Sequence, residues 1–302
     1  MKHVKILLLP ILLTLSSRTA LAQAGPAPET DMRQTGLIPT PETTTMSTPK
    51  ETLTKLRVIY KKVDNVELAL HMFSLREHKP DDSRPAIVFF FGGGWTGGAP
   101  EQFFPQAEHF ASRGMVAISA EYRVARKHGT DPRACVSDGK SAMRYIRSNA
   151  RDLGIDPTRI AAGGGSAGGH VAAAAATLSG FNEDGEDTSV SCVPDALVLF
   201  NPVFDNGPGG YGHGRVKDYW EDFSPLHNLS TDVPPTVIFL GDSDNLIPVA
   251  TAEAYRDAMR NLGIRCELHI YPGQGHGFFN KSRFKETLME ADRFLTSLGY
   301  ME

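Results

Sequence analysis

Short apolar runs that alternate with helical segments constrain the fold of this chain more than any other feature. Six runs of strand length are apolar at almost every position: AIVFFF, GMVAISA, RIAAGG, ALVLFNP, PTVIFLG and CELHIYPG. A strand with apolar residues on both faces must be covered on both faces. Helices between the runs can supply that cover, so the pattern predicts an α/β fold of one domain, with a mostly parallel sheet between two layers of helices.

The segments around these runs support the same architecture. Helices are predicted over residues 132–152, 167–178, 249–262 and 284–298. The first of them has Asp131 at its N-cap and Pro132 at position N1, a combination that favours a helix start. Two alternating segments, LRVIYKKV and VELALHMFSL, flank Asp64–Asn65 and predict an antiparallel hairpin at the front of the sheet.

The first residues have the composition of an export signal. Lys2 and Lys5 precede the apolar run ILLLPILLTL, which is too short to span a bilayer, and small residues at Ala20–Ala22 are typical of a cleavage site. The alternative, a buried N-terminal helix, is disfavoured because Pro10 interrupts the run. We therefore expect a signal peptide over residues 1–22 and a secreted or periplasmic protein.

A change of composition divides the remaining chain in two. Residues 23–54 are rich in Pro and Thr and contain little to pack, which is typical of a flexible leader, whereas residues 55–302 keep the alternating pattern without repeats. Loss of the three positive charges in the first 22 residues would change the formal net charge from −4 to −7. An acidic protein without a basic cluster is unsuited to nucleic acid or anionic membranes, and no other run is apolar enough for membrane insertion.

The cysteines and histidines do not form a metal-binding pattern. Cys135, Cys192 and Cys266 lack metal-ligand spacing, and the odd number permits at most one disulfide, whose pair the sequence does not decide. All three also suit a protein core as small buried residues. His213, in GYGHGR, offers a single ligand, which does not make a metal site. We expect neither a metal nor an organic cofactor.

In a parallel sheet, the residues that do chemistry gather at the carboxyl ends of the strands. Five predicted strands are followed by glycine-rich or polar segments: GGGW, GGGSAGG, NPVFD, GDSDNLIP and GQGHGF. One segment contains an isolated serine, one contains acids and one contains a histidine among glycines, in the chain order Ser, Asp, His. These residue types at one sheet edge predict nucleophilic catalysis.

Ser166 is the candidate nucleophile. It lies at the centre of a G-x-S-x-G pattern between a strand and an Ala-rich helix, where small neighbours allow a tight, strained turn. Two phosphate-binding interpretations are weaker. A P-loop requires a Lys–Ser/Thr pair after the glycines, and none follows. Gly163, Gly165 and Gly168 fit a dinucleotide fingerprint, but the acidic residues about 20 positions later lie in a polar loop instead of at a strand end.

The acid and the base come from two later strand ends. Asp242 and Asp244 both follow PTVIFLG, and either fits an ordinary turn. Asp244 is favoured because its G-x-x-D-x-x-I-P spacing lets the carboxylate point back along the sheet edge. His276 is one of ten histidines, but its neighbours in GQGHGF leave the ring little to pack on, and it follows the last strand. The predicted triad is therefore Ser166, Asp244 and His276.

These motifs resemble those of the α/β-hydrolases, in particular bacterial esterases and lipases related to hormone-sensitive lipase and to the BD-FAE type of feruloyl and acetyl-xylan esterases. The resemblance covers about residues 56–298 and rests on FGGGW, SAEYR, GGSAGG, GDSDNLIP and GHGF in this order. It implies the α/β-hydrolase fold and a catalytic domain over residues 55–302. Ser166 would then be the nucleophile and His276 the base, oriented by Asp244.

The same resemblance implies an oxyanion hole, the set of N–H groups that stabilises the negative oxygen of the tetrahedral intermediate. Its donors here would be the N–H groups of Gly93, Gly94 and Ala167, and glycine is needed because side chains would keep the ester carbonyl away. The histidine that usually precedes the glycines orients this loop. Phe91 stands in its place here and would hold the loop by packing.

Substrate contacts are predicted from aromatic residues near these motifs. The segment NGPGGYGHGRVKDYW, residues 206–220, is either an ordinary surface loop or a flap in which Tyr211 or Trp220 stacks on a sugar or aryl ring. Trp95, beside the glycine loop, is a further candidate contact. The sequence shows neither an inserted cap domain nor an amphipathic lid helix of the kind that suits oil surfaces.

The sequence therefore predicts a serine carboxylesterase for short-chain acyl esters, with an acetylated carbohydrate such as xylan as a favoured substrate. An arylformamidase-like amidase would have the same glycine loop and triad. A non-catalytic binding protein of the same fold would normally have lost a triad member, and a peptidase would normally carry a large extra domain. The acyl chain, the alcohol and the oligomeric state are left open.

Overall fold

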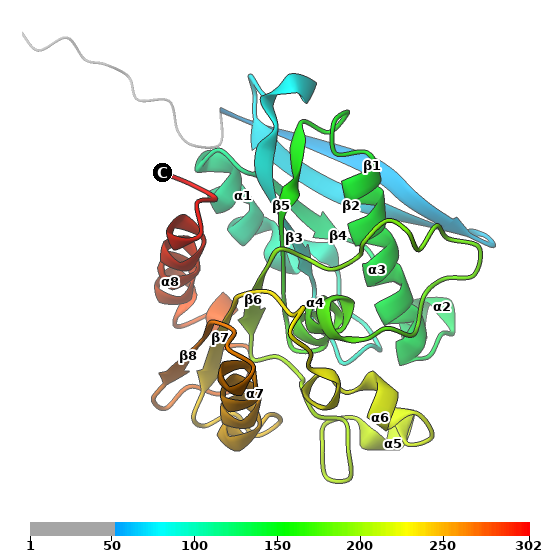
Figure 1. Cartoon of the computed structure of the whole chain (residues 1–302), viewed down its shortest axis with the longest axis vertical. Coiled ribbons are helices and arrows are strands. Elements are labelled where there is room, and N and C mark those ends of the chain that lie inside the picture. The colour runs from blue at the N-terminus through cyan, green and yellow to red at the C-terminus, as the bar shows by residue number, and fades with distance from the viewer. Residues whose placement is uncertain (1–51) are drawn as a thin grey trace, which may run out of the picture. The chain divides into compact units, whose positions relative to one another are not determined.

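The computed structural model describes residues 52–302. The predicted signal peptide and nearly all of the predicted leader lie outside the described residues. The described part is an eight-stranded sheet with helices α1 and α8 on one face and α3, α4 and α7 on the other (Figure 1). The strands are β1 (Leu53–Val63), β2 (Val66–Leu75), β3 (Arg84–Phe90), β4 (Val116–Ala120), β5 (Ile155–Gly165), β6 (Ala196–Phe200), β7 (Thr236–Gly241) and β8 (Cys266–Tyr271).

The strand order is β1-β2-β4-β3-β5-β6-β7-β8. β1 pairs antiparallel with β2, and β2 pairs antiparallel with β4, whereas all neighbours from β4 to β8 pair in parallel. Val63 pairs with Val66, and Asp64 adopts a left-handed φ of 49° in the turn between them. The mostly parallel sheet with an antiparallel hairpin at its front is therefore confirmed.

The four predicted helices are present, and each ends slightly earlier than expected. The helices are α1 (Phe104–Ser112), α2 (Ala125–His128), α3 (Pro132–Ser148), α4 (Ala167–Thr177), α5 (His213–Val216), α6 (Trp220–Phe223), α7 (Val249–Asn261) and α8 (Phe284–Ser297), with short 3-10 turns η2 (Pro80–Asp82), η3 (Pro100–Phe103), η4 (Pro225–Asn228) and η5 (Phe278–Asn280). At the start of α3, the Asp131 carboxylate accepts the Arg133 N–H at 2.9 Å, as the predicted N-cap requires. Helix α1, which the sequence pattern did not indicate, packs on β2 and β4.

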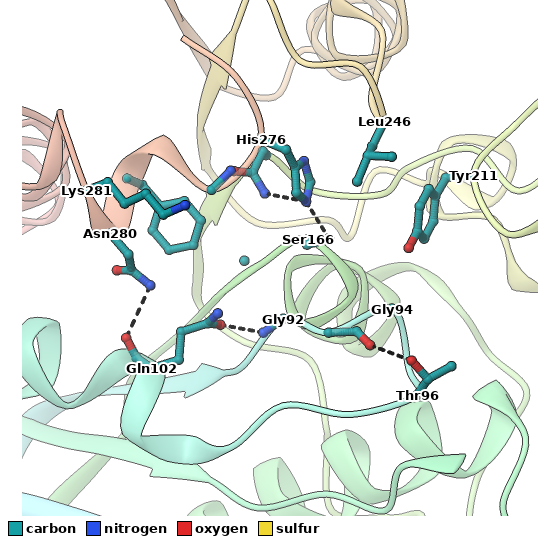
Figure 2. Close-up of a pocket in the computed structure, with 15 residues that line it drawn as sticks. Gly92, Gly94, Thr96, Gln102, Ser166, Tyr211, Leu246, His276, Asn280 and Lys281 are labelled. Atoms are coloured by element: carbon teal, nitrogen blue, oxygen red, sulfur yellow. Dashed lines mark hydrogen bonds between the residues drawn. The ribbon is translucent and has the colours of Figure 1, made fainter. Parts of the chain in front are cut away.

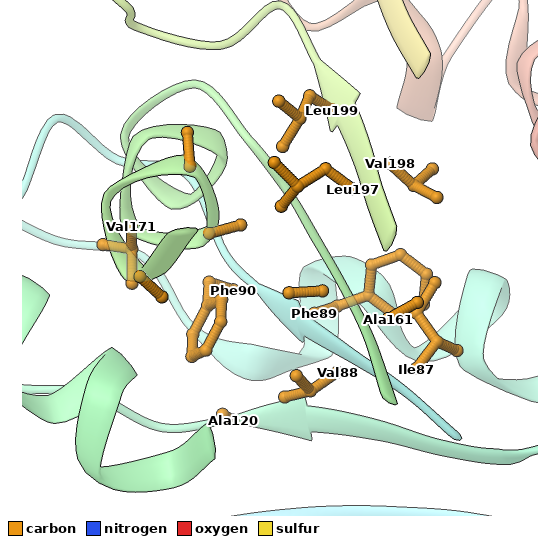
Figure 3. Packing of buried hydrophobic residues seen from close by; sticks show 14 of the residues in the cluster. Ile87, Val88, Phe89, Phe90, Ala120, Ala161, Val171, Leu197, Val198 and Leu199 are labelled. Carbon is orange, nitrogen blue, oxygen red and sulfur yellow. The ribbon is translucent and has the colours of Figure 1, made fainter. Parts of the chain in front are cut away.

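The core is centred on β3, whose residues Ala86 to Phe90 are fully buried. Consecutive side chains point to opposite faces of the sheet (Figure 3). Phe89 stacks on Phe103 at 5.0 Å between ring centroids, whereas Phe90 lies towards α4 and Val171. Each such ring contributes about 1.5–3 kcal/mol by burial. This packing fixes the carboxyl end of β3, which leads directly into the glycine loop.

The cysteines of the chain are core residues. Cys135, Cys192 and Cys266 are all buried and free, so they are core residues and no disulfide joins them. Among residues 52–302, no helix combines the length and the apolar character needed to cross a membrane. The same residues contain no group of three or more His, Cys, Asp or Glu side chains arranged to hold a metal ion.

Candidate active site

Ser166 lies on a sharp turn between β5 and α4. Its backbone has φ 55° and ψ −119°, a strained conformation for a residue other than glycine. The turn depends on small neighbours, because a Cβ at Gly164 would lie 2.5 Å from the Gly168 carbonyl oxygen and one at Gly168 would lie 2.0 Å from the Phe90 oxygen. The Ser166 N–H donates to the Phe200 carbonyl at 2.9 Å, which ties the turn to the end of β6.

His276 lies beside Ser166 at the pocket (Figure 2) and also contacts an acid. The Ser166 Oγ lies 2.9 Å from His276 Nε2, and His276 Nδ1 lies 2.7 Å from Asp244 Oδ2. Asp244 Oδ1 accepts the N–H groups of Leu246 at 2.8 Å and Ile247 at 3.0 Å. Burial alone would raise the pKa of Asp244, but the hydrogen bonds from His276 and from these two N–H groups outweigh it and hold the pKa below its usual value.

The structure distinguishes the two candidate acids. Asp242 Oδ1 accepts the Gly273 N–H at 2.7 Å and the Ser243 hydroxyl at 3.1 Å, so this carboxylate joins the loops that follow β7 and β8. The carboxylate that the structure brings to His276 is that of Asp244, whose side chain is fully buried.

Asn201 is a site residue that the sequence analysis did not identify. It follows β6, is fully buried and has a φ of 35°. Its Oδ1 accepts the Gly277 N–H at 3.0 Å, and its Nδ2 lies 3.4 Å from His276 Nε2. Asn201 therefore holds the segment that carries His276. The motif NPVFD was noted as a strand end, but the sequence does not show which loop its asparagine contacts.

The glycine loop has the backbone that an oxyanion hole requires. Gly93 and Gly94 have φ of 138° and 61°, which favour glycine. The Gly93 carbonyl accepts the N–H groups of Thr96 and Gly97, and a Cβ at Gly93 would lie 2.2 Å from the Gly97 oxygen. Within residues 52–302 the N–H groups of Gly93 and Gly94 have no acceptor. Ala167 is the first residue of α4, so its N–H has no intrahelical acceptor.

These groups border a pocket of about 380 Å³. The glycine loop, Ser166, His276 and Asn201 contribute to its lining, together with the apolar side chains of Leu246 and Phe279 and the ring of Tyr211. The volume lies near the lower end of the range for small-molecule sites. The pocket can therefore take a small ester, with its carbonyl over the serine.

The three predicted aromatic contacts have different positions. Tyr211 lines the pocket. Trp95 is 1% exposed and packs on His170 and Phe223, outside the pocket lining, because its left-handed φ of 59° turns the indole into the core. Trp220 also lies away from the pocket and packs on His227. Of the predicted substrate contacts, the structure therefore brings Tyr211 alone to the serine.

The sequence is similar to several known esterases. The BD-FAE family model matches residues 74–198, and the model of the dienelactone hydrolase family matches residues 213–295. Carboxylesterase NlhH of Mycobacterium tuberculosis is 34% identical over 259 residues, which cover 78% of this chain and 79% of that protein. An acetylxylan esterase of Xylanibacter ruminicola is 27% identical over 230 residues, 71% of this chain and 44% of that protein. The chain spans about half the length of several other curated esterases that it matches.

A solved structure is similar over most of the described chain. Native Thermogutta terrifontis esterase 2 has a TM-score of 0.78 and 42% identity, covering 82% of this chain and 93% of that one. Other structures of that protein have propionate or butyrate bound, or are phosphorylated by paraoxon. The fold and these similarities show that the chain belongs to the α/β-hydrolase esterases, a family of carboxylic ester hydrolases.

Proposed function

We propose that the protein is a serine carboxylesterase for short acyl chains. The observation that carries this proposal is the continuous hydrogen-bonded chain from Ser166 through His276 to Asp244, at the floor of a small pocket. Ser166 Oγ attacks the ester carbonyl while His276 Nε2 takes its proton. Asp244 holds the imidazole in place and stabilises its cationic form.

The reaction then proceeds in two halves. The tetrahedral intermediate collapses, the bond to the alcohol oxygen breaks, and His276 gives its proton to the departing alcohol. Water attacks the acyl-enzyme and loses a proton to His276. The bond to Ser166 Oγ then breaks, His276 returns the proton to that oxygen, and the acid is released. In both halves the N–H groups of Gly93, Gly94 and Ala167 donate to the oxyanion, and loss of one such donor would raise the barrier by about 3 kcal/mol.

The size of the pocket supports short acyl chains. Its volume of about 380 Å³ and its wall of Leu246 and Phe279 suit a few carbons better than a fatty acid chain. The propionate and butyrate complexes of the related Thermogutta esterase point the same way. We therefore expect kcat/KM to be highest on acetate to butyrate esters and lowest on palmitate esters.

For the natural substrate we propose an acetylated polysaccharide met outside the cell. The related acetylxylan esterase supports a deacetylating role, and Tyr211 supplies an aromatic ring in the pocket lining that a sugar can contact. The export signal predicted over residues 1–22 supports the location. The test is acetate release from acetylated xylan beside p-nitrophenyl acetate, with N-formylkynurenine as the amide alternative. Turnover of p-nitrophenyl acetate without release from xylan would reject the polysaccharide and keep the esterase.

The nucleophile is tested by labelling and substitution. Paraoxon should phosphorylate Ser166, and peptide mass mapping would identify the modified residue. Ser166→Ala should lower kcat/KM on p-nitrophenyl acetate by at least about 10⁴-fold. Ser243→Ala is the matched control, because Ser243 is an exposed serine next to Asp244 and its hydroxyl donates to Asp242. A label on another serine, or native activity in Ser166→Ala, would disprove the assignment.

A further inference from the structure

Gln102 occupies a place in the active site that the sequence analysis did not assign. It lies in η3, lines the same pocket as Ser166, and its Oε1 accepts the Gly92 N–H at 2.5 Å (Figure 2). Phe91, at the position of the family's loop-orienting histidine, makes no such contact. Its buried ring stacks on Tyr122 at 4.1 Å between centroids. Packing therefore places Phe91, while Gln102 supplies the polar contact.

The peptide unit between Phe91 and Gly92 is held at both of its polar groups. The Phe91 carbonyl accepts the Tyr122 hydroxyl, and the Gly92 N–H donates to Gln102. Burial raises the pKa of Tyr122 well above its usual value, so its hydroxyl keeps the proton that it donates. Because a peptide unit is planar, two fixed groups fix its plane. The Gly93 N–H belongs to the next peptide unit, which is joined to this plane through the φ and ψ of Gly92. The fixed plane therefore anchors one end of the unit that carries the Gly93 N–H.

The rest of the loop is held by groups other than Gln102. The Gly93 carbonyl accepts two N–H groups from its own turn, and the Gly94 carbonyl accepts Arg215 Nη1 from the flap. These contacts orient the peptide units that follow Gly93. The unit that carries the Gly93 N–H lies between these contacts and the Phe91–Gly92 unit, where Gln102 is the acceptor that residues 52–302 provide for the Gly92 N–H.

Gln102 has a fixed backbone although its side chain is exposed to the pocket. Its neighbour Phe103 is fully buried and stacks on Phe279 at 5.7 Å between ring centroids. The Gln102 carbonyl accepts Asn280 Nδ2 at 3.3 Å, and Asn280 Oδ1 accepts Gln106 Nε2 at 2.6 Å. Asn280 lies in η5, shortly after His276. These contacts fix η3 relative to the segment that carries the catalytic base.

We propose that Gln102 is a positioning residue of the oxyanion hole. By accepting the Gly92 N–H, it directs the Gly93 N–H towards the oxyanion, and so takes over the role that the resemblance gives to the histidine replaced by Phe91. The inference rests on the proposed esterase function. Gln102 acts through the backbone and takes no part in bond making.

The test is Gln102→Leu, which removes the acceptor and keeps a similar volume. A misdirected N–H weakens binding of the transition state more than that of the substrate. On p-nitrophenyl acetate we expect kcat and kcat/KM to fall together by about tenfold, with KM changed by less than about twofold. The Ki of butylboronic acid, which forms a tetrahedral adduct on the serine, should rise by about the same factor.

Two further variants separate the acceptor from its surroundings. Gln102→Asn keeps the amide but is one methylene too short to reach Gly92, so its kcat should fall as in Gln102→Leu. Glu101→Leu changes the neighbouring residue in η3, whose exposed side chain points to a different pocket beside Phe91 and Tyr122. Its kcat and boronate Ki should equal those of the native protein.

The outcomes also distinguish this inference from the proposed function. If Ser166→Ala is inactive but Gln102→Leu keeps native kcat and boronate Ki, the role of Gln102 is disproved and the esterase mechanism stands. A change confined to KM, or an equal fall in Glu101→Leu, would also disprove it. If Ser166→Ala keeps native activity, the proposed function itself fails.

Discussion

Two glycine-rich segments border the active site and resemble each other in sequence. Residues 92–98 read GGGWTGG, and residues 207–214 read GPGGYGHG, each with an aromatic residue among glycines. Their surroundings differ. A Cβ at Gly93 or Gly98 would lie 2.2 Å from a backbone oxygen, whereas Gly209 and Gly214 have no atom within 4 Å of the position that a Cβ would take.

The difference shows that glycine content does not reveal why glycine is present. In the first segment one stretch of backbone approaches another, and neither can move without changing the oxyanion loop. In the second, the close neighbours are partly side chains, such as the Trp95 ring at 2.6 Å from a Cβ at Gly212. Gly93 and Gly98 are therefore fixed by backbone contacts, whereas the second segment combines open positions, Gly209 and Gly214, with the closely packed Gly210 and Gly212.

The largest effect is expected for Gly93→Ala. The new Cβ would meet the Gly97 carbonyl oxygen, and φ 138° is a conformation that alanine rarely adopts. The loop must shift, and the loss of a correctly placed donor should lower kcat/KM on p-nitrophenyl acetate by at least about 100-fold. A kcat/KM within about fivefold of native would show that the glycine loop tolerates a side chain at this position as well as residues 207–214 do.

An intermediate effect is expected for Gly212→Ala. This residue has φ 75°, and its Cβ would press on the Trp95 ring, which is buried and has little room to move. Overpacking and the left-handed backbone together should cost about 1–3 kcal/mol of unfolding free energy, measured by urea denaturation. Tyr211 would move with the flap, so kcat/KM should fall several-fold. Unchanged stability would mean that the flap is not packed on Trp95 in solution.

A smaller effect is expected for Gly209→Ala. Its φ of 87° is left-handed, but no atom lies near the position of a Cβ. The substitution should cost about 1–2 kcal/mol through backbone strain alone. Because Gly209 contacts neither Ser166 nor the glycine loop, kcat/KM should stay within about twofold of native. A large loss of activity with native stability would contradict the prediction that the active site tolerates substitution at Gly209.

The smallest effect is expected for Gly214→Ala. This residue lies in α5, has no left-handed φ and has open space around it. Alanine favours a helix and restricts the unfolded chain, so the unfolding free energy should stay the same or rise by up to about 1 kcal/mol. Loss of stability in Gly214→Ala would show that this position is closely packed, as Gly212 is.

Much of the fold and the order of the site residues followed from the sequence alone. Continuous apolar runs cannot be left uncovered, so alternation with helices required a sheet between two helical layers. Parallel strands all end at the same edge, so the serine, the acid and the histidine were predicted to converge without knowledge of their contacts. The helix that begins at Pro132 was predicted from its own cap, because capping is a local interaction.

Contacts between loops were decided by the tertiary structure. The choice of Asp244 over Asp242, the burial of Trp95, and the contacts of Gln102 and Asn201 all depend on how separate loops meet. Asn201 and His276 are 75 positions apart, and no local pattern encodes their distance. A hydrogen bond forms only when donor and acceptor come within about 3 Å. For residues on different loops, packing of the whole sheet sets that distance. The residue types that do the chemistry could therefore be predicted from the sequence, whereas the hydrogen-bond partners of each residue depend on the tertiary structure.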